Sequence, residues 1–303
     1  MPTPILQPGE IEAGAPPAPW LKLPAASPFA ARAQRLEALA ADHALADYLR
    51  FVAALCRAQH EAYALLPAAV PPSAATLERC RIHAMPPLDA ANLARDAAWH
   101  PALKHILSAV SAQAAAPARA AIERLGALDA PALAAVAGGL LRHDGENLDR
   151  AAAPFVAAAL QVYGHRLAAA LDVRDVGRPE TLALCPVCGS PPVAGSVHVG
   201  AEHGLRYLHC ALCGSEWNVV RIKCSSCENT KGIAYYGIEH GSAAVKAETC
   251  DACRSYLKIL YLEKDPAADP LADDLASIAL DLLLDEQGYQ RSGLNYFLIP
   301  GPS

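Results

Sequence analysis

Eight of the ten cysteines in this 303-residue chain lie in four Cys-x-x-Cys pairs in its C-terminal half. A Cys-x-x-Cys turn, called a knuckle, places two thiolates on the same side of a tight loop. Two facing knuckles supply the tetrahedral set of four sulfurs that Zn²⁺ or a single rubredoxin-type iron prefers. The sequence therefore predicts two mononuclear four-sulfur metal cages, formed by Cys185 and Cys188, Cys210 and Cys213, Cys224 and Cys227, and Cys250 and Cys253.

The spacing of the four knuckles repeats. The first two knuckles are separated by 21 residues (189–209) and the last two by 22 residues (228–249), while 10 residues (214–223) link the two units. Strand-like residues follow the second knuckle of each unit, at 217–222 and 256–262. The matched gaps predict that each cage joins neighbouring knuckles, although a crossed pairing of the first knuckle with the third stays open.

The metal is left open between zinc and iron, because thiolate cages accept both. Ligand type alone favours zinc, and an iron–sulfur cluster is a further option. Gly189 and Gly214 follow the second cysteine of the first two knuckles, where the chain needs a positive φ. Glu228 and Arg254 stand at the equivalent positions of the second unit, which puts the filling of that cage in doubt.

Disulfides are the alternative for a cysteine-rich region. The segment Met1–Trp20 is rich in proline and has neither the basic start nor the apolar core of a secretory signal. A cytosolic chain keeps its thiols reduced, so repeated Cys-x-x-Cys pairs there indicate metal binding. We therefore expect a cytoplasmic protein with reduced cysteines. Cys56 and Cys80, outside the repeat, are expected to be structural.

The rest of the chain is predicted to be mainly helical. Hydrophobic residues make up 53% of the chain but aromatic residues only 6%, so alanine and leucine must supply the core. Ser27 and Pro28 resemble the cap and first position of a helix, and Asp42 resembles the cap of a second helix. Further helices are expected at 90–113, 117–127, 130–142 and 149–171.

After the knuckles, Asp269 and Pro270 predict the start of another helix. Its apolar stripe is expected to comprise Leu275, Ile278, Ala279 and Leu282, and the apolar tail 293–299 is expected to dock on the body. The predicted class is α+β, with an all-α domain before two tandem rubredoxin-like or zinc-ribbon β modules. The predicted boundaries are a lead-in at 1–26, a helical domain at 27–178, modules at 179–219 and 220–264, and a C-terminal helix with a docked tail at 265–303.

Charge and motifs argue against several functions. Residues 179–264 carry eight Lys or Arg and eight Asp or Glu, and the whole chain has a net charge of −6, whereas a nucleic-acid binder shows a basic face. No phosphate-binding Gly loop, nucleophile elbow or His-Glu-x-x-His motif occurs, and filled cages leave no open coordination position. No apolar run is long enough to cross a bilayer. The nearby histidines are not needed as ligands: His198, His203, His209 and His240.

A helical body that carries rigid, metal-braced modules favours a scaffold that holds another protein. An electron carrier of the rubredoxin kind is the alternative, but it needs no helical domain larger than its metal modules. A zinc-ribbon nucleic-acid binder is the weaker alternative, and it would use a local basic face formed by Arg206, Arg221, Lys223 and Lys258.

Several motifs together resemble the formate dehydrogenase accessory protein family, densely over 185–297 and loosely before. They are Cys185-Pro-Val-Cys-Gly-Ser190, Gly204-Leu-Arg-Tyr-Leu-His-Cys210, Val220-Arg-Ile-Lys-Cys-Ser225, Tyr256-Leu-Lys-Ile-Leu-Tyr261, Ala272-Asp-Asp-Leu-Ala-Ser277 and Pro86-Pro-Leu-Asp89. The resemblance implies a cytoplasmic assembly factor for respiratory formate dehydrogenases that contacts the catalytic subunit and is not itself a dehydrogenase.

The same resemblance implies two rubredoxin-like modules and shifts the expected metal from zinc towards iron. Two stretches are expected to meet the partner protein. One is 204–207, with Arg206 and Tyr207 beside the first cage, and the other is the Pro86–Asp89 motif, with Pro87 and Asp89. Bracing of a hairpin by Arg206, and a plain helix-start turn at Asp89, are the structural alternatives.

Overall fold

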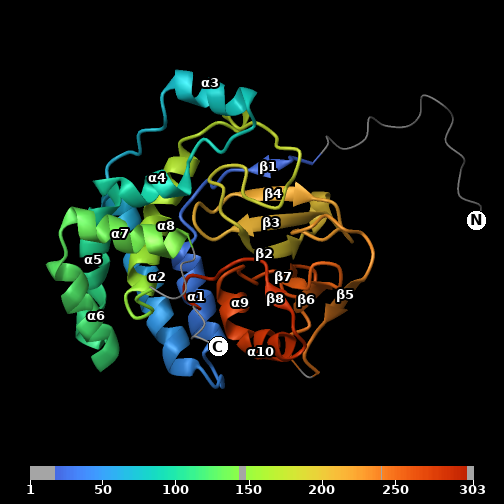
Figure 1. Ribbon diagram of the computed structural model, residues 1–303. Helices are drawn as coiled ribbons and strands as arrows, with labels where there is room; N and C mark the ends of the chain where they lie inside the picture. The colour runs from blue at the N-terminus through green and yellow to red at the C-terminus, as the bar shows by residue number, and fades with distance from the viewer. Residues whose placement is uncertain (1–17, 143–147, 240, 299–303) are drawn as a thin grey trace, which may run out of the picture.

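The computed structural model describes residues 18–142, 148–239 and 241–298. Three parts are visible in Figure 1: an all-α domain, a mixed β-sheet with both cysteine modules, and a pair of C-terminal helices beside the sheet. The predicted α+β class is therefore confirmed. Most of the lead-in, His240 and the end of the tail from Ile299 lie outside the described residues.

The core of the all-α domain is built around two long helices, α2 (Ala46–Leu65) and α8 (Ala153–Ala169). Their buried faces consist mostly of alanine and leucine. Small alanine side chains let neighbouring helices approach closely, which compensates for the scarcity of aromatic residues. Two buried hydrogen bonds join these two helices, because the Gln59 amide nitrogen donates to the side-chain oxygen of Gln161 at 2.9 Å and to the carbonyl of Ala158 at 3.0 Å. The helices are α1 (Phe29–Leu39), α2 (Ala46–Leu65), α3 (Ala74–Ile82), α4 (Ala90–Arg95), α5 (His100–Val110), α6 (Ala116–Ala127), α7 (Ala130–Leu141) and α8 (Ala153–Ala169).

Two predicted helix boundaries are wrong. The stretch 90–113 is not one helix, because Asp96 takes an extended conformation (φ −75°, ψ 126°) and its carboxylate accepts a hydrogen bond from the amide of Ala98. This local cap ends α4 and starts a new turn before α5. Asp42 does not cap α2, since it lies in a left-handed turn (φ 56°) and α2 begins at Ala46.

Both cysteine modules belong to one sheet with the strand order β1-β4-β3-β2-β7-β6-β5, and β8 pairs with β7. Strands β2 to β4 form an antiparallel unit in the first module, and strands β5 to β7 form one in the second. The strands are β1 (Leu21–Lys22), β2 (Pro192–Val197), β3 (Arg206–Cys210), β4 (Glu216–Val219), β5 (Ile233–Tyr236), β6 (Val245–Cys250), β7 (Ser255–Tyr261) and β8 (Gln290–Arg291).

The two antiparallel units join through a parallel seam, in which Gly195, Ser196 and Val197 of β2 pair with 259–261 of β7. The sequence repeat gives no sign of this seam, because it links strands from different repeats. The predicted lead-in also contributes to the sheet, since β1 pairs with β4 at its outer edge.

The C-terminal segment forms two short helices instead of the single predicted one, α9 (Ala272–Ala276) and α10 (Ile278–Glu286). The Ser277 hydroxyl donates to the carbonyl of Asp273 at 2.7 Å, and the chain changes direction there. The predicted apolar stripe is consequently wrong at Ala279 and Leu282, which are exposed, while Leu280 and Leu284 are buried. The tail docks as predicted, with Asn295, Tyr296 and Phe297 buried.

Candidate metal centres

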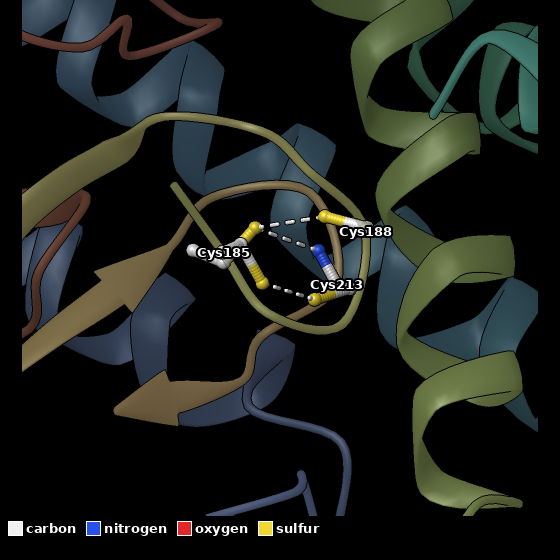
Figure 2. Close-up of side chains that lie close together, drawn as sticks. Cys185, Cys188 and Cys213 are labelled. Atoms are coloured by element: carbon white, nitrogen blue, oxygen red, sulfur yellow. Dashed lines mark hydrogen bonds between the residues drawn. The ribbon is translucent and has the colours of Figure 1, made fainter. Parts of the chain in front are cut away.

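The eight knuckle cysteines form two groups of four, and the sulfurs within each group lie within 4.8 Å of one another. The first group joins the knuckles of Cys185 and Cys210, and the second joins those of Cys224 and Cys250. In Figure 2, three side chains of the first group point toward one another from two loops. The groups follow the contiguous arrangement that the matched gaps predict, and all eight cysteines are free of disulfides.

The sulfur spacing suits a tetrahedral ion. Four sulfurs at about 2.3 Å from a central metal lie about 3.8 Å apart along the edges of the tetrahedron. The first cage has Sγ–Sγ distances of 3.6 Å between Cys185 and Cys213 and 3.4 Å between Cys188 and Cys210. The second cage has 3.7 Å for both Cys224–Cys253 and Cys227–Cys250. The donor set and its dimensions therefore fit a mononuclear thiolate site.

All four knuckles have the same backbone form, including the two without glycine. The residue after the second cysteine takes a positive φ of 78° at Gly189, 72° at Gly214, 62° at Glu228 and 56° at Arg254. Side chains are unfavourable in this region. Glu228 forms an ion pair of 2.9 Å with Lys223, and the guanidinium of Arg254 lies 3.9 Å from the centre of the Tyr289 ring. These contacts offset the strain, so the lack of glycine does not prevent closure of the second cage.

The two cages differ in burial. All four cysteines of the first cage are buried, whereas Cys227 and Cys253 of the second cage are exposed. The first cage lies against the all-α domain, where a Cβ at Gly214 would fall 2.4 Å from the ring of His165. Burial lowers the pKa of His165 to about 3, so its imidazole is neutral at physiological pH. The first site is therefore enclosed by protein, and the second borders solvent.

Arg206 is not a surface residue, which overturns its predicted contact with a partner. Its side chain is 2% exposed and forms a 2.8 Å ion pair with Glu248 of the second module. Glu248 also accepts a 2.7 Å hydrogen bond from the hydroxyl of Tyr235. Tyr207 is fully buried, and its hydroxyl donates to the carbonyl of Pro19 at 2.9 Å. Arg206 thus connects the two modules, and Tyr207 holds the chain that leads into β1.

The Pro86–Asp89 motif lies beside the first cage. The amide of Leu88 donates to the carbonyl of Val187 at 2.8 Å, and the amide of Ala90 donates to that of Cys188 at 3.2 Å. Pro87 is buried, whereas Asp89 is exposed and caps α4. The motif therefore supports the first knuckle through backbone hydrogen bonds, while the Asp89 side chain remains accessible to solvent.

Histidine takes no part in either group, because both groups of possible metal ligands among the described residues consist of cysteines alone. His209 and His198 instead lie near the carboxylate of Glu216, at 3.3 and 3.8 Å.

Sequence reasoning missed a buried ionic network between β7 and the C-terminal helices. Lys258 has a fully buried side chain that contacts Asp281 at 2.5 Å and Asp274 at 3.4 Å, and Arg291 also pairs with Asp274. Burial alone would raise the pKa of Asp274, but Arg291 and Lys258 together hold it below its usual range. A lysine in the middle of an apolar strand is the one signal that points to this network.

No helix among the described residues is both long and apolar enough to span a bilayer. Together, the fold and site define a mixed helical and β protein with two four-cysteine groups that could each hold a metal ion. Family models named FdhE match nearly all of it: the N-terminal model at residues 17–180, the central domain at 184–221 and the C-terminal domain at 222–298. The chain belongs to the FdhE family.

Relatives match over nearly their full length. The chain is 46% identical to the FdhE homolog of Pseudomonas aeruginosa, with 98% of both chains covered. It is 41% identical to the FdhE protein of Salmonella enteritidis, over 89% of this chain and 87% of the relative. A crystal structure of the FdhE protein from Pseudomonas aeruginosa superimposes with a TM-score of 0.87 at 45% identity, covering 94% of this chain and all of that one.

Proposed function

We propose that this protein is a cytoplasmic assembly factor for a respiratory formate dehydrogenase, that it binds the catalytic subunit, and that it catalyses no reaction itself. The observation that carries this proposal is full-length membership of the FdhE family. The geometry supports a binding role, because four thiolates close each cage and leave no open coordination position for a substrate.

The eight knuckle cysteines are proposed to hold one metal ion in each cage, with iron favoured over zinc. When bound, the metal cross-links the knuckles, and iron would in addition accept and release an electron. The chain's own residues fix the loops: the amides of Gly189 and Gly214 donate back to the carbonyls of Cys185 and Cys210 at 2.8 and 3.0 Å. Modules this small depend on such cross-links for folding.

A second candidate function is electron transfer to the client or to a cofactor in it. The exposure of Cys227 and Cys253 favours this role for the second cage, because a redox partner can approach a metal that borders solvent. The enclosed first cage suits a structural role in either case.

Deletion and complementation in the native host test the proposal. Deletion of the gene is expected to abolish formate dehydrogenase activity while the catalytic polypeptide is still made, and tagged protein is expected to co-purify with that polypeptide. Full activity in the deletion strain would refute an assembly role. A Cys253→Ser variant that still binds the client but restores no activity would favour electron transfer over simple scaffolding.

The metal is tested on protein purified without oxygen. Iron in a four-thiolate cage is expected to give a ferric charge-transfer absorption after mild oxidation. Protein that stays colourless and contains stoichiometric zinc would show that zinc fills the cages.

A further inference from the structure

A groove of 850 Å³ runs from the region of α3 to the first cage. Its walls come from the loops on either side of α3, from α4 and α8, and from the first knuckle; they include Val70, Met85, Pro87, Leu167, Cys188 and Gly189. In Figure 1, α3 stands at the margin of the all-α domain, away from the main helix bundle. The volume falls within the range of ligand and peptide sites in proteins.

The outer rim of the groove is apolar and lacks a covering element among the described residues. The nine-residue helix α3 has no fully buried side chain. Val70, just before it, is 83% exposed, and Met85, just after it, is 57% exposed. Large apolar side chains gathered at the rim of a groove are typical of a protein-binding surface. Methionine suits such a surface because its flexible side chain adapts to a partner.

The charged residues that line the groove are all acidic. Asp89 and Asp96 are its only charged lining residues, and neither forms an ion pair within the part of the chain that the structure describes. Both are exposed, and each uses one carboxylate oxygen to cap a helical turn. The other oxygen of Asp96 accepts a hydrogen bond from Tyr163. A partner with Lys or Arg side chains would complement these carboxylates, whereas an acidic partner would be repelled.

The first knuckle lines the groove through Cys188 and Gly189. The Leu88 and Ala90 amides bind the carbonyls of Val187 and Cys188, so the wall with the acidic side chains is tied to the first cage. The groove is thus part of a rigid frame, which reduces the entropy lost when a partner binds.

We propose that this groove binds an extended segment of the formate dehydrogenase catalytic subunit that carries apolar side chains and at least one Lys or Arg. The inference rests on the proposed assembly function and specifies where the client docks and with what chemistry. Apolar side chains of the client pack between Val70 and Met85, and its cation lies near Asp89 and Asp96. The contact made by the client is therefore on the all-α side of the first cage and away from Arg206.

Site-specific photo-crosslinking in the native host tests the location. Benzoylphenylalanine in place of Met85 is expected to crosslink to the catalytic subunit, and mass spectrometry should place the bond in a segment with a basic residue. The same substitution of Leu282, which is 61% exposed on α10, is the matched control and should not crosslink to the client. Crosslinks from Leu282 alone, or from Met85 only to a second copy of this chain, would overturn the inference.

Removal of the two carboxylate charges tests the proposed electrostatic contact, in binding measurements with purified protein and client. The Asp89→Asn and Asp96→Asn double variant keeps an oxygen at each cap, because asparagine is an equally good N-cap. Its affinity for the catalytic subunit is expected to fall about three- to tenfold, and less at high salt. Asp129→Asn, at the cap of α7 outside the groove, should bind as the wild type does.

The outcomes separate the two proposals. If the client binds the wild type, but the double variant binds with unchanged affinity and Met85 does not crosslink, the groove is the wrong surface and the assembly function stands. If no complex forms between the wild-type protein and the client, the assembly function fails and the groove inference fails with it.

Discussion

Replacement of Arg206 tests whether this residue braces the modules or meets a partner. In Arg206→Ala, the carboxylate of Glu248 stays buried and loses its cation, while the Tyr235 hydroxyl still donates to it. Breaking a buried ion pair from one side costs about 3–5 kcal/mol of unfolding free energy. At about 2–4 °C per kcal/mol for a domain of this size, the melting temperature should fall by about 6–20 °C.

The assay is calorimetric or fluorescence-detected melting of metal-loaded protein, with metal content measured in parallel. Arg221→Ala is the control, since Arg221 is exposed on the link between the modules and its loss should change stability by less than about 0.5 kcal/mol. The double variant Arg206→Met with Glu248→Leu should recover most of the lost stability, because no buried charge is left unpaired. An unchanged melting temperature in Arg206→Ala, with weaker client binding, would restore the surface role and refute the bracing argument.

Three further results are expected. In native protein, an alkylating agent in the presence of a chelator should modify the exposed Cys227 and Cys253 well before any cysteine of the first cage, and equal rates at both cages, read by mass spectrometry, would contradict the difference in burial. Cys185→Ser should lose one metal and destabilise the first module, whereas Cys56→Ser should keep both metals; equal metal loss in elemental analysis would show that the cysteines are wrongly divided. The depressed pKa of Asp274 in the folded state contributes stability that is fully present above its unfolded pKa of about 3.9 and is lost as pH falls through the folded pKa. Denaturant titrations should therefore show that the free energy of unfolding falls below about pH 4, and that this fall is smaller in Asp274→Asn.

The cysteine groups were predictable because their chemistry is local. Two thiolates three residues apart, repeated at matched intervals, leave few arrangements that can close a tetrahedron. The helical domain was predictable for a similar reason, since alanine and leucine have high helix propensity and the signal accumulates over long runs bounded by proline. The docked tail followed from its apolar composition, and Tyr296 and Phe297 are indeed buried.

The errors lie where a local signal competes with a distant contact. Arg206 looks like a surface cation in the sequence, and only the parallel seam brings Glu248 within reach of it. Leu282 fits an apolar stripe that continues through Ser277, but the hydroxyl of Ser277 bonds to the backbone and the stripe is broken there. Glu228, in place of glycine, put the filling of the second cage in doubt, yet it adopts the left-handed conformation and forms a salt bridge with Lys223.

Because β2 and β7 pair with each other, the two repeats are not independent domains. A chain terminated after the first module would expose β2 as an unpaired edge, ready to pair with another molecule and aggregate. The same fragment would carry the positive charge of Arg206 without its partner Glu248. Dissection of this protein into single-cage pieces is therefore expected to yield insoluble material. The contribution of each cage has to be measured in the intact chain, by point substitution.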